Sequence, residues 1–372
     1  MEIEEYNDKN YKLLKLISGF VVGEELFFSA WNERGFFSYN FKNGQVKFLT
    51  FLPEVFPQCN YGHFCKVGSE VYLMPCHGNS IICLDSENWG KYTEYKLNEK
   101  KIGEPNTWYG NAFHVGDCLY VRPYSSHSIA CLNINKGKIS YYDDFYEKVK
   151  SRKEAGDRPL FMGNALLDGK MYFVCQNTKI LVEFDTSKAQ SRVFDIDGIT
   201  GNLENVCSDG ENLWFYLNSG DLIKWNNNQG IKKVYKQPVK GNANENSICY
   251  FNNKIWVAGK SLYECVSVDV KNDEVHIRTF NREVEETPGS GTLCDVGNIL
   301  LYLPNKNEHV YVIDEKSDLL KGFRIELRGE EYISFLNEMM HDKIKNRKVV
   351  EEINDDMLKL FVKELKHMEE NT

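Results

Sequence analysis

Hydrophobic and polar residues alternate with a period of two along most of the chain, in short runs typical of β-strands. Seven runs share one character, being apolar or aromatic and preceded by a tight-turn dipeptide: "EELFFSA", "SEVYLMP", "DCLYVRP", "GKMYFVC", "ENLWFYL", "NKIWVAG" and "GNILLYLP". The dipeptides are Val-Gly, Asp-Gly or Asn-Asn, in which Gly, Asp or Asn accepts a positive φ at low cost. We therefore expect each run to be the second strand of a β-hairpin.

The leading aliphatic positions of these runs recur every 42 to 52 residues, at Leu26, Val71, Leu119, Met171, Leu213, Ile255 and Ile299. A third strand in each unit ends in Asp or Asn, at Asn40, Asp85, Asn133, Asp185, Asn226, Asp269 and Asp314. A fourth strand follows, as in "GKISYYDDF". Four short strands in each of seven units predict an all-β fold, a seven-bladed β-propeller. An irregular pair of β-sandwiches is the alternative.

After Gly329 the period changes from two to that of a helix. Apolar residues form two stripes, the first at Ile333, Leu336, Met340 and Ile344, and the second at Val350, Ile353, Met357, Phe361, Leu365 and Met368. We therefore predict a propeller over residues 1–328 and a C-terminal α-helical extension over residues 329–372. The extension either packs against the propeller or contacts a partner, including a second copy of the chain. Near the amino terminus, "YKLLKL" is either an extra strand on the last blade or the lead into the first blade.

The aromatic-rich second strands, together with third strands of the form I-x-x-(F/L)-D, resemble kelch-like and galactose-oxidase-like propellers over residues 17–328. Kelch repeats usually have a Gly-Gly pair at the end of the second strand and a Trp in the fourth. This chain has Met-Pro, Arg-Pro or Leu-Pro at the first place and mostly Tyr, Phe or Ile at the second. The resemblance implies the architecture and transfers no catalytic residue.

The net charge of the 372-residue chain is −9, and no basic face is apparent. Nucleic acid is therefore a poor candidate partner. The 11 Cys include no Cys-x-x-Cys pair, which favours reduced core thiols over a structural zinc site. Neither a secretory signal nor a membrane-spanning apolar run is expected. We expect a cytoplasmic protein without a cofactor.

The first strand of each predicted blade begins with a polar residue: Ser18, His63, Asn111, Asn164, Asn205, Asn246 and Thr292. In a propeller this strand lines the central channel. These side chains either bond backbone groups of the next blade or form a polar ring that holds a ligand at the channel mouth, and the two roles are compatible. Loops next to this end of the blades carry further polar and aromatic side chains, among them Trp31, Arg34, Tyr109 and Tyr124.

The candidate ligand-binding residues are His63, His77, Trp108, Asn111, Arg122, His127, Arg158, Asn164, Glu204, Asn205 and Asn246. Trp and Tyr side chains offer stacking surface for a sugar, a peptide or a base. Arg side chains can bind a carboxylate, and a His with Glu204 can perform acid–base chemistry. No metal site is predicted, because no His-x-His or His-x-x-x-His spacing occurs.

Three functions remain open at this point. The first is a binding or scaffold module that recognises a protein, a peptide or a small polar ligand such as a sugar on the loop face. The second is an enzyme, namely a lyase, epimerase or hydrolase acting on a sugar or peptide with His, Glu and Arg. The third is a structural part of a larger assembly. Propellers host all of these, so the predicted fold does not decide between them.

Overall fold

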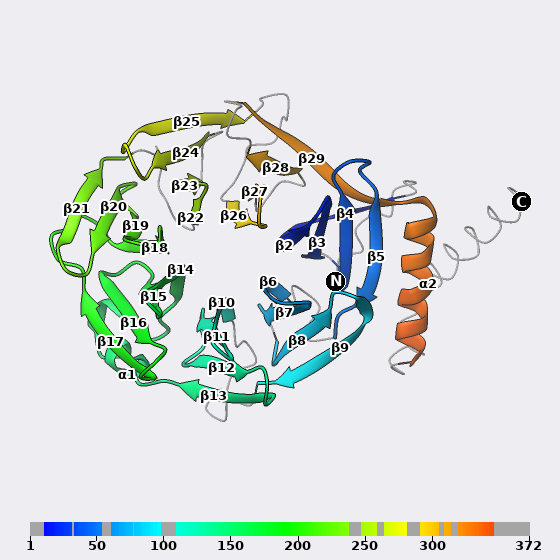
Figure 1. Cartoon of the computed structure of the whole chain (residues 1–372), viewed down its shortest axis with the longest axis horizontal. Coiled ribbons are helices and arrows are strands. Elements are labelled where there is room, and N and C mark those ends of the chain that lie inside the picture. Colours follow the sequence, from blue (N-terminus) through cyan, green and yellow to red (C-terminus); the bar gives the residue numbers. More distant parts are fainter. Residues whose placement is uncertain are drawn as a thin grey trace, which may run out of the picture. The chain divides into compact units, whose positions relative to one another are not determined.

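The computed structural model describes residues 11–31, 33–53, 61–76, 78–97, 109–237, 247–258, 264–280, 291–304, 309–313 and 319–345. Two compact units are present. One is Leu13–Glu326, and the other combines Met1–Lys12 with Leu327–Thr372. The first unit holds the blades of a seven-bladed β-propeller, as predicted, and each blade is an antiparallel sheet of four strands (Figure 1). Among the described residues, no helix combines the length and the apolar character needed to cross a membrane.

The strands follow the chain from the channel outward in every blade. Blade 1 consists of β2 (Leu16–Val22), β3 (Glu25–Ala30), β4 (Gly35–Asn40) and β5 (Val46–Phe51). Blade 2 consists of β6 (Tyr61–Val67), β7 (Glu70–Pro75), β8 (Ser80–Asp85) and β9 (Asn88–Lys96). Blade 3 consists of β10 (Tyr109–Val115), β11 (Cys118–Pro123), β12 (Ile129–Asn133) and β13 (Lys138–Tyr142). Blades 4 and 5 consist of β14 (Phe161–Leu167), β15 (Lys170–Cys175), β16 (Ile180–Asp185) and β17 (Gln190–Asp195); and β18 (Leu203–Ser208), β19 (Leu213–Leu217), β20 (Leu222–Asn226) and β21 (Gly230–Tyr235). Blades 6 and 7 consist of β22 (Ser247–Phe251), β23 (Lys254–Ala258), β24 (Glu264–Asp269) and β25 (Val275–Phe280); and β26 (Gly291–Asp295), β27 (Leu300–Pro304), β28 (His309–Ile313) and β29 (Leu319–Arg328).

The Asp or Asn that ends each third strand caps the hairpin to the fourth strand. The Asp185 carboxylate accepts hydrogen bonds from the backbone N–H groups of Ser187 and Lys188, at 3.0 and 3.1 Å. Equivalent bonds to backbone N–H groups are made by Asn40, Asp85, Asn133, Asn226 and Asp269. The seventh marker, Asp314, lies outside the described residues. The repeat seen in the sequence is therefore a repeat of turn chemistry.

The hydrophobic core lies between the blades. Six clusters of buried residues among the described segments each join two consecutive blades, from blades 1 and 2 to blades 6 and 7. The cluster between blades 1 and 2, for example, stacks Phe20 on Phe27 at 5.4 Å and brings Trp89 of β9 to 4.8 Å from Phe27. Each blade is thus stabilised mainly by packing against its two neighbours, because a sheet has to bury its apolar side chains against another element.

Ring closure joins the first and last blades directly. Val21 N–H of β2 donates to the carbonyl of Val296, at 2.9 Å, and Ser18 Oγ lies 3.5 Å from Cys294 Sγ of β26. Further out, Tyr39 of β4 stacks on Phe323 of β29 with ring centroids 5.0 Å apart. An additional strand, β1 (Tyr11–Leu14), pairs with β29. "YKLLKL" therefore fulfils both predictions, because it forms an extra strand on the last blade and leads directly into β2 of the first blade.

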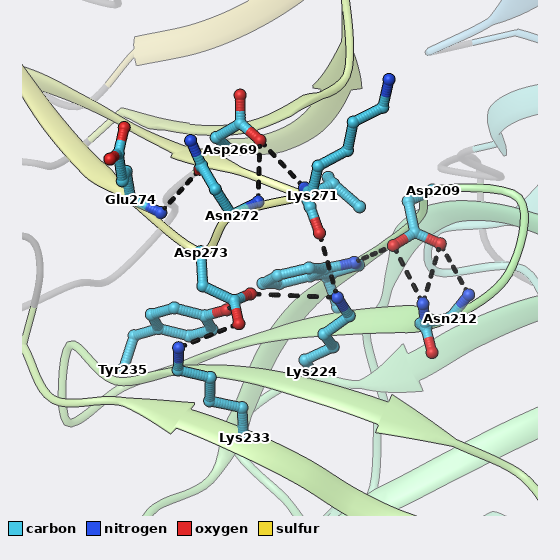
Figure 2. Close-up of polar contacts among 12 residues, drawn as sticks. Asp209, Asn212, Lys224, Lys233, Tyr235, Asp269, Lys271, Asn272, Asp273 and Glu274 are labelled. Carbon is cyan, nitrogen blue, oxygen red and sulfur yellow. Dashed lines mark hydrogen bonds and ion pairs between the residues drawn. The ribbon is translucent and has the colours of Figure 1, made fainter.

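Blades 5 and 6 are also joined by polar contacts between β20 and β21 of blade 5 and the turn that joins β24 to β25 in blade 6 (Figure 2). Asp273, in the turn before β25, accepts hydrogen bonds from Tyr235 Oη and from Lys233 Nζ, the latter at 3.0 Å. Lys224 Nζ donates to the carbonyl of Val270 at 3.3 Å. In the turn of blade 5, Asp209 accepts from the indole N–H of Trp214 at 2.7 Å, which orients a buried Trp.

Helical segments occur in two places. The predicted C-terminal helix begins where the sequence indicated, as α2 (Gly329–Lys345), and the second apolar stripe lies outside the described residues. A short helix, α1 (Tyr146–Lys150), and the 3-10 turn Lys153–Ala155 were not predicted. They occupy the connection from blade 3 to blade 4, where Phe145 and Val149 are buried against Phe161 and Phe173.

Replacing Asp209 by Ala should lower the free energy of unfolding by about 2 to 3 kcal/mol, because the buried N–H groups that donate to Asp209 lose their hydrogen-bond partner. These donors are the backbone N–H of Asn212, at 2.6 Å, and the indole N–H of Trp214. Asp197→Ala removes an exposed carboxylate from the turn between β17 and β18 and is the matched control. Urea unfolding followed by Trp fluorescence measures both variants. Equal stability of the two would contradict the proposed role of Asp209.

Candidate functional site

The polar residues at the start of the inner strands lie at a recurring backbone irregularity. In the described strands, β2, β6, β10, β14 and β18 each shift register within their first residues, whereas β22 and β26 pair without interruption. A β-bulge of this kind adds a residue and changes the direction of the side chain that follows. The start of β6 therefore positions His63, and the start of β10 positions Asn111.

His63 and Asn111 meet between blades 2 and 3. The Asn111 side chain is hydrogen-bonded to the imidazole of His63, and the guanidinium of Arg122, near the end of β11, is close enough to repel a proton on that ring. Burial and then the charge of Arg122 lower the pKa of His63 to about 3. The imidazole is therefore neutral at physiological pH.

Arg122 is the most buried member of this group, with 5% of its surface exposed. Its Nη1 donates to the carbonyl of Pro123 at 2.9 Å and to the carbonyl of Phe161 in β14, so it ties blade 3 to blade 4. In the described part of the chain, Nε is buried and makes no hydrogen bond. Burial lowers the pKa of Arg122 to about 10. The phenol of Tyr124 and the thiol of Cys76 act in the opposite direction and raise this pKa. The guanidinium remains a cation at neutral pH.

The glycines that precede the polar residues make room for these side chains. A Cβ on Gly110 would overlap the guanidinium of Arg122, and a Cβ on Gly62 would overlap the Sγ of Cys76. Both glycines follow a buried Tyr in the same position of their strands, in "YGHF" and "YGNA". This repeated Tyr-Gly pair is a sequence signal for the site. Sequence reasoning did not name Cys76 as a candidate, because its contact with Gly62 is visible only in the structure.

The remaining candidates are distributed over other contacts. Glu204 is buried in β18, where its Oε2 accepts from Gln176 Nε2 at 3.0 Å, and Asn205 Oδ1 accepts from the backbone N–H of Val206 at 2.9 Å. His127 stacks on Tyr146 of α1 with ring centroids 4.0 Å apart, and the exposed Arg158 acts electrostatically on the same Tyr.

Four of the predicted site residues are described by the structure only in part or not at all. His77, Trp108 and Asn246 lie outside the described residues. For Asn164 the structure gives the backbone, which pairs with Cys207 of β18. Tyr109, which we expected to offer stacking surface on the loop face, is instead buried in the core between blades 2 and 3. Trp31 is half exposed, in the loop before β4.

We call the group of His63, Cys76, Asn111, Arg122 and Tyr124 the Arg122 cluster. A neutral imidazole whose pKa is about 3 is a weak base near neutral pH, so the cluster is better suited to hydrogen bonding than to proton transfer. Burial also raises the pKa of the nearby inner-strand thiol of Cys65 to about 11. Within the described residues, no group of three or more His, Cys, Asp or Glu is arranged to hold a metal ion.

Gly110→Ala should displace the Arg122 guanidinium and destabilise the fold, because the new methyl group needs the space that the guanidinium occupies. We expect a loss of about 1 to 3 kcal/mol in the free energy of unfolding. Gly90→Ala is the control, since its Cβ would meet nothing closer than 3.7 Å. Urea unfolding of both variants measures the difference, and an unchanged Gly110→Ala protein would show that the guanidinium is not held there.

The stability of the protein should fall as the pH drops from 7 to 5, in part through His63. Its folded pKa lies below the ordinary value of 6.5, so the unfolded chain binds the proton more readily in this range. The contribution is about 1 to 2 kcal/mol over this window. His63→Gln should remove this part of the pH dependence, whereas His276→Gln, at an exposed position of β25, should keep it. The measurement is urea unfolding at several pH values, and identical pH profiles for both variants would refute the assignment.

Comparison with known proteins supports the architecture alone. No protein-family model matches the chain, and no curated protein matches it. Among solved structures, virginiamycin B lyase from Staphylococcus aureus is 15% identical, with a TM-score of 0.53 over 71% of this chain and 84% of the lyase. A streptogramin B lyase is 13% identical, with a TM-score of 0.57 over 79% of this chain and 93% of its own. YCF48, solved bound to D1 peptide, is 10% identical, with a TM-score of 0.56 over 82% of this chain and 94% of its own. The seven-bladed propeller is thus confirmed, and the kelch-like resemblance stays a prediction.

Proposed function

We propose that the chain is a binding module whose ligand contacts the loop face at the Arg122 cluster. One observation carries this proposal: a buried guanidinium has an unsatisfied Nε and lies beside a neutral imidazole and an amide. Buried polar groups are almost always hydrogen-bonded, so the unsatisfied Nε of Arg122, beside the start of the inner strands, calls for an explanation. A ligand that accepts a hydrogen bond from it is the explanation that we propose. The ligand is a protein, a peptide or a small polar molecule.

The scaffold suits this role. The inner strands are held between two neighbouring blades, and Arg122 is fixed by carbonyl groups of blades 3 and 4. A side chain held in this way loses little conformational freedom when a ligand binds. A protein with a similar fold, YCF48, was solved with a peptide bound, which supports peptide binding as one use of such a surface. At 10% identity it supports no particular residue.

The alternative is an enzyme acting at the channel mouth, as a lyase, epimerase or hydrolase on a sugar or peptide. Two of the similar structures are lyases, and Glu204 is a buried carboxylate near the start of an inner strand. A buried Glu is a reasonable general acid or base. Against this, His63, the histidine of the cluster, has its pKa lowered to about 3, far from the value near neutral pH that suits a general acid or base. We therefore rank binding first.

We extend the proposal to the rest of the chain as follows. Residues 1–328 form the ligand-binding propeller, and residues 329–372 form a helical segment that contacts a partner or a second copy of the chain. The buried side chains of α2, Tyr332 and Phe335, lie beside the predicted apolar stripe and support a packing role for this helix. The location is cytoplasmic, which agrees with the absence of disulfides among the ten described cysteines.

A thermal-shift screen against sugars, amino acids and short peptides tests the binding role. A ligand at a hundred times its Kd stabilises the native state by about 2.7 kcal/mol and raises Tm. The shift should be lost in Asn111→Ala and kept in Asn227→Ala, which alters an exposed turn on the opposite face. Mass spectrometry of each stabilising compound after incubation separates binding from catalysis. A compound that stabilises all three proteins equally does not use this site, and chemical conversion of the compound would favour the enzyme.

A further inference from the structure

Among the described residues, the charge of Arg122 is not balanced by a carboxylate. The ionisable groups that act on it are a phenol, Tyr124, and a thiol, Cys76, and its hydrogen bonds go to two backbone carbonyl groups. Two buried carboxylates of the chain, by contrast, are paired. Glu183 is 2% exposed and accepts from Lys170 Nζ at 3.1 Å, and Asp221 is bound by Lys236 Nζ at 2.9 Å. An unbalanced buried cation costs free energy, and an anion that binds beside it would recover that cost.

The N–H groups of the Arg122 guanidinium suit a planar ligand group with a single negative charge. A guanidinium presents its N–H groups in one plane and binds carboxylates through two parallel hydrogen bonds. Nη1 is already used by Pro123 and Phe161, and Nε is not used. His63 stays neutral, so it adds a hydrogen-bonding group and no second positive charge. A carboxylate matches this single cation, whereas a phosphate dianion would keep one charge unbalanced.

The cluster also borders on solvent. Arg122 is buried, but His63, Cys76, Asn111 and Tyr124 around it are each partly exposed. These residues come from the first residues of two inner strands and from the segments that follow β7 and β11, which lie at the same end of blades 2 and 3. A group that approaches from the loop face therefore meets the polar side chains next to the guanidinium.

We propose that the Arg122 cluster is a carboxylate-binding site, in which the Arg122 guanidinium binds the carboxylate of the ligand while His63 and Asn111 contact its neighbouring polar atoms. This inference rests on the proposed binding function and specifies its ligand. The ligand is a small organic acid or a peptide that presents a free carboxylate. Neutral sugars fall outside this class.

The experiment uses the full chain with defined probes. N-acetylglycine and benzoate are the acids, N-acetylglycinamide and benzamide are their neutral isosteres, and inorganic phosphate is the competing anion. The wild-type protein, labelled with ¹⁵N-arginine, is titrated with each probe while the Nε–Hε signals are followed by NMR. Arg122→Met identifies the Arg122 signal. Arg192→Met removes an exposed arginine of β17 and is the matched control.

The acids should shift the Arg122 signal and raise Tm, and the amides should do neither. In Arg122→Met the affinity for the acids should fall roughly 10- to 100-fold, as expected for a lost hydrogen bond to a charged group. Arg192→Met should bind as the wild type does. If Arg122→Met fails to fold, Arg122→Lys identifies the signal instead, and the wild-type titration then tests the inference, because the shifted signal belongs to the residue itself.

Three results would overturn the inference. Equal binding of the acids and their amides would show that the charge is not recognised. Phosphate binding tighter than the acids would assign the site to another anion. Acid binding that Arg122→Met retains would place the acids elsewhere. In each case the proposed binding function is still supported if sugars or peptides raise the Tm of the wild type and not that of Asn111→Ala. A screen in which no compound raises Tm would contradict the proposed function as well.

Discussion

Seven sheets can close into a ring only if their inner strands approach one another closely at the centre, and this constraint governs the rest of the molecule. Close approach excludes large side chains at certain positions, as at Gly163 of β14, where a Cβ would overlap Val206 of β18, the inner strand of the next blade. It also favours the bulges at the start of five of the described inner strands, because the strands must turn into the channel. The polar residues that follow are placed by this geometry.

The same constraint explains why packing between blades dominates stability. Each described cluster of buried residues takes its members from two consecutive blades, so no blade has a core of its own among them. The turns add local order, since capping Asp and Asn residues hold the outer hairpins, and Asp209 holds the buried Trp214. A rigid ring of this kind can hold a charged side chain such as Arg122 in one position through backbone carbonyl groups of two blades.

The repeat, the number of blades and the first C-terminal helix were predictable, because each depends on local residue patterns. The Arg122 cluster was predictable only as a set of candidates. His63, Asn111 and Arg122 were all named, but their contact depends on how β6, β10 and β11 meet across two blades, which spacing along the chain does not encode. Short α1 was missed because one turn of apolar residues, Phe145, Tyr146 and Val149, is too brief for a periodic signal. Burial of Tyr109 depends on the neighbouring blade in the same way.

The contact between Ser18 and Cys294, which closes the ring, joins residues 276 positions apart and therefore has a kinetic consequence. A chain that is being synthesised cannot close the ring between blade 1 and blade 7 until the last inner strand has been made. At about 5 to 20 residues per second this delay is on the order of tens of seconds. During that time the flank of blade 1 that later receives Phe323, including Tyr39, remains without its partner. Long-range closure of this kind slows folding and leaves apolar surface exposed to other chains while synthesis continues.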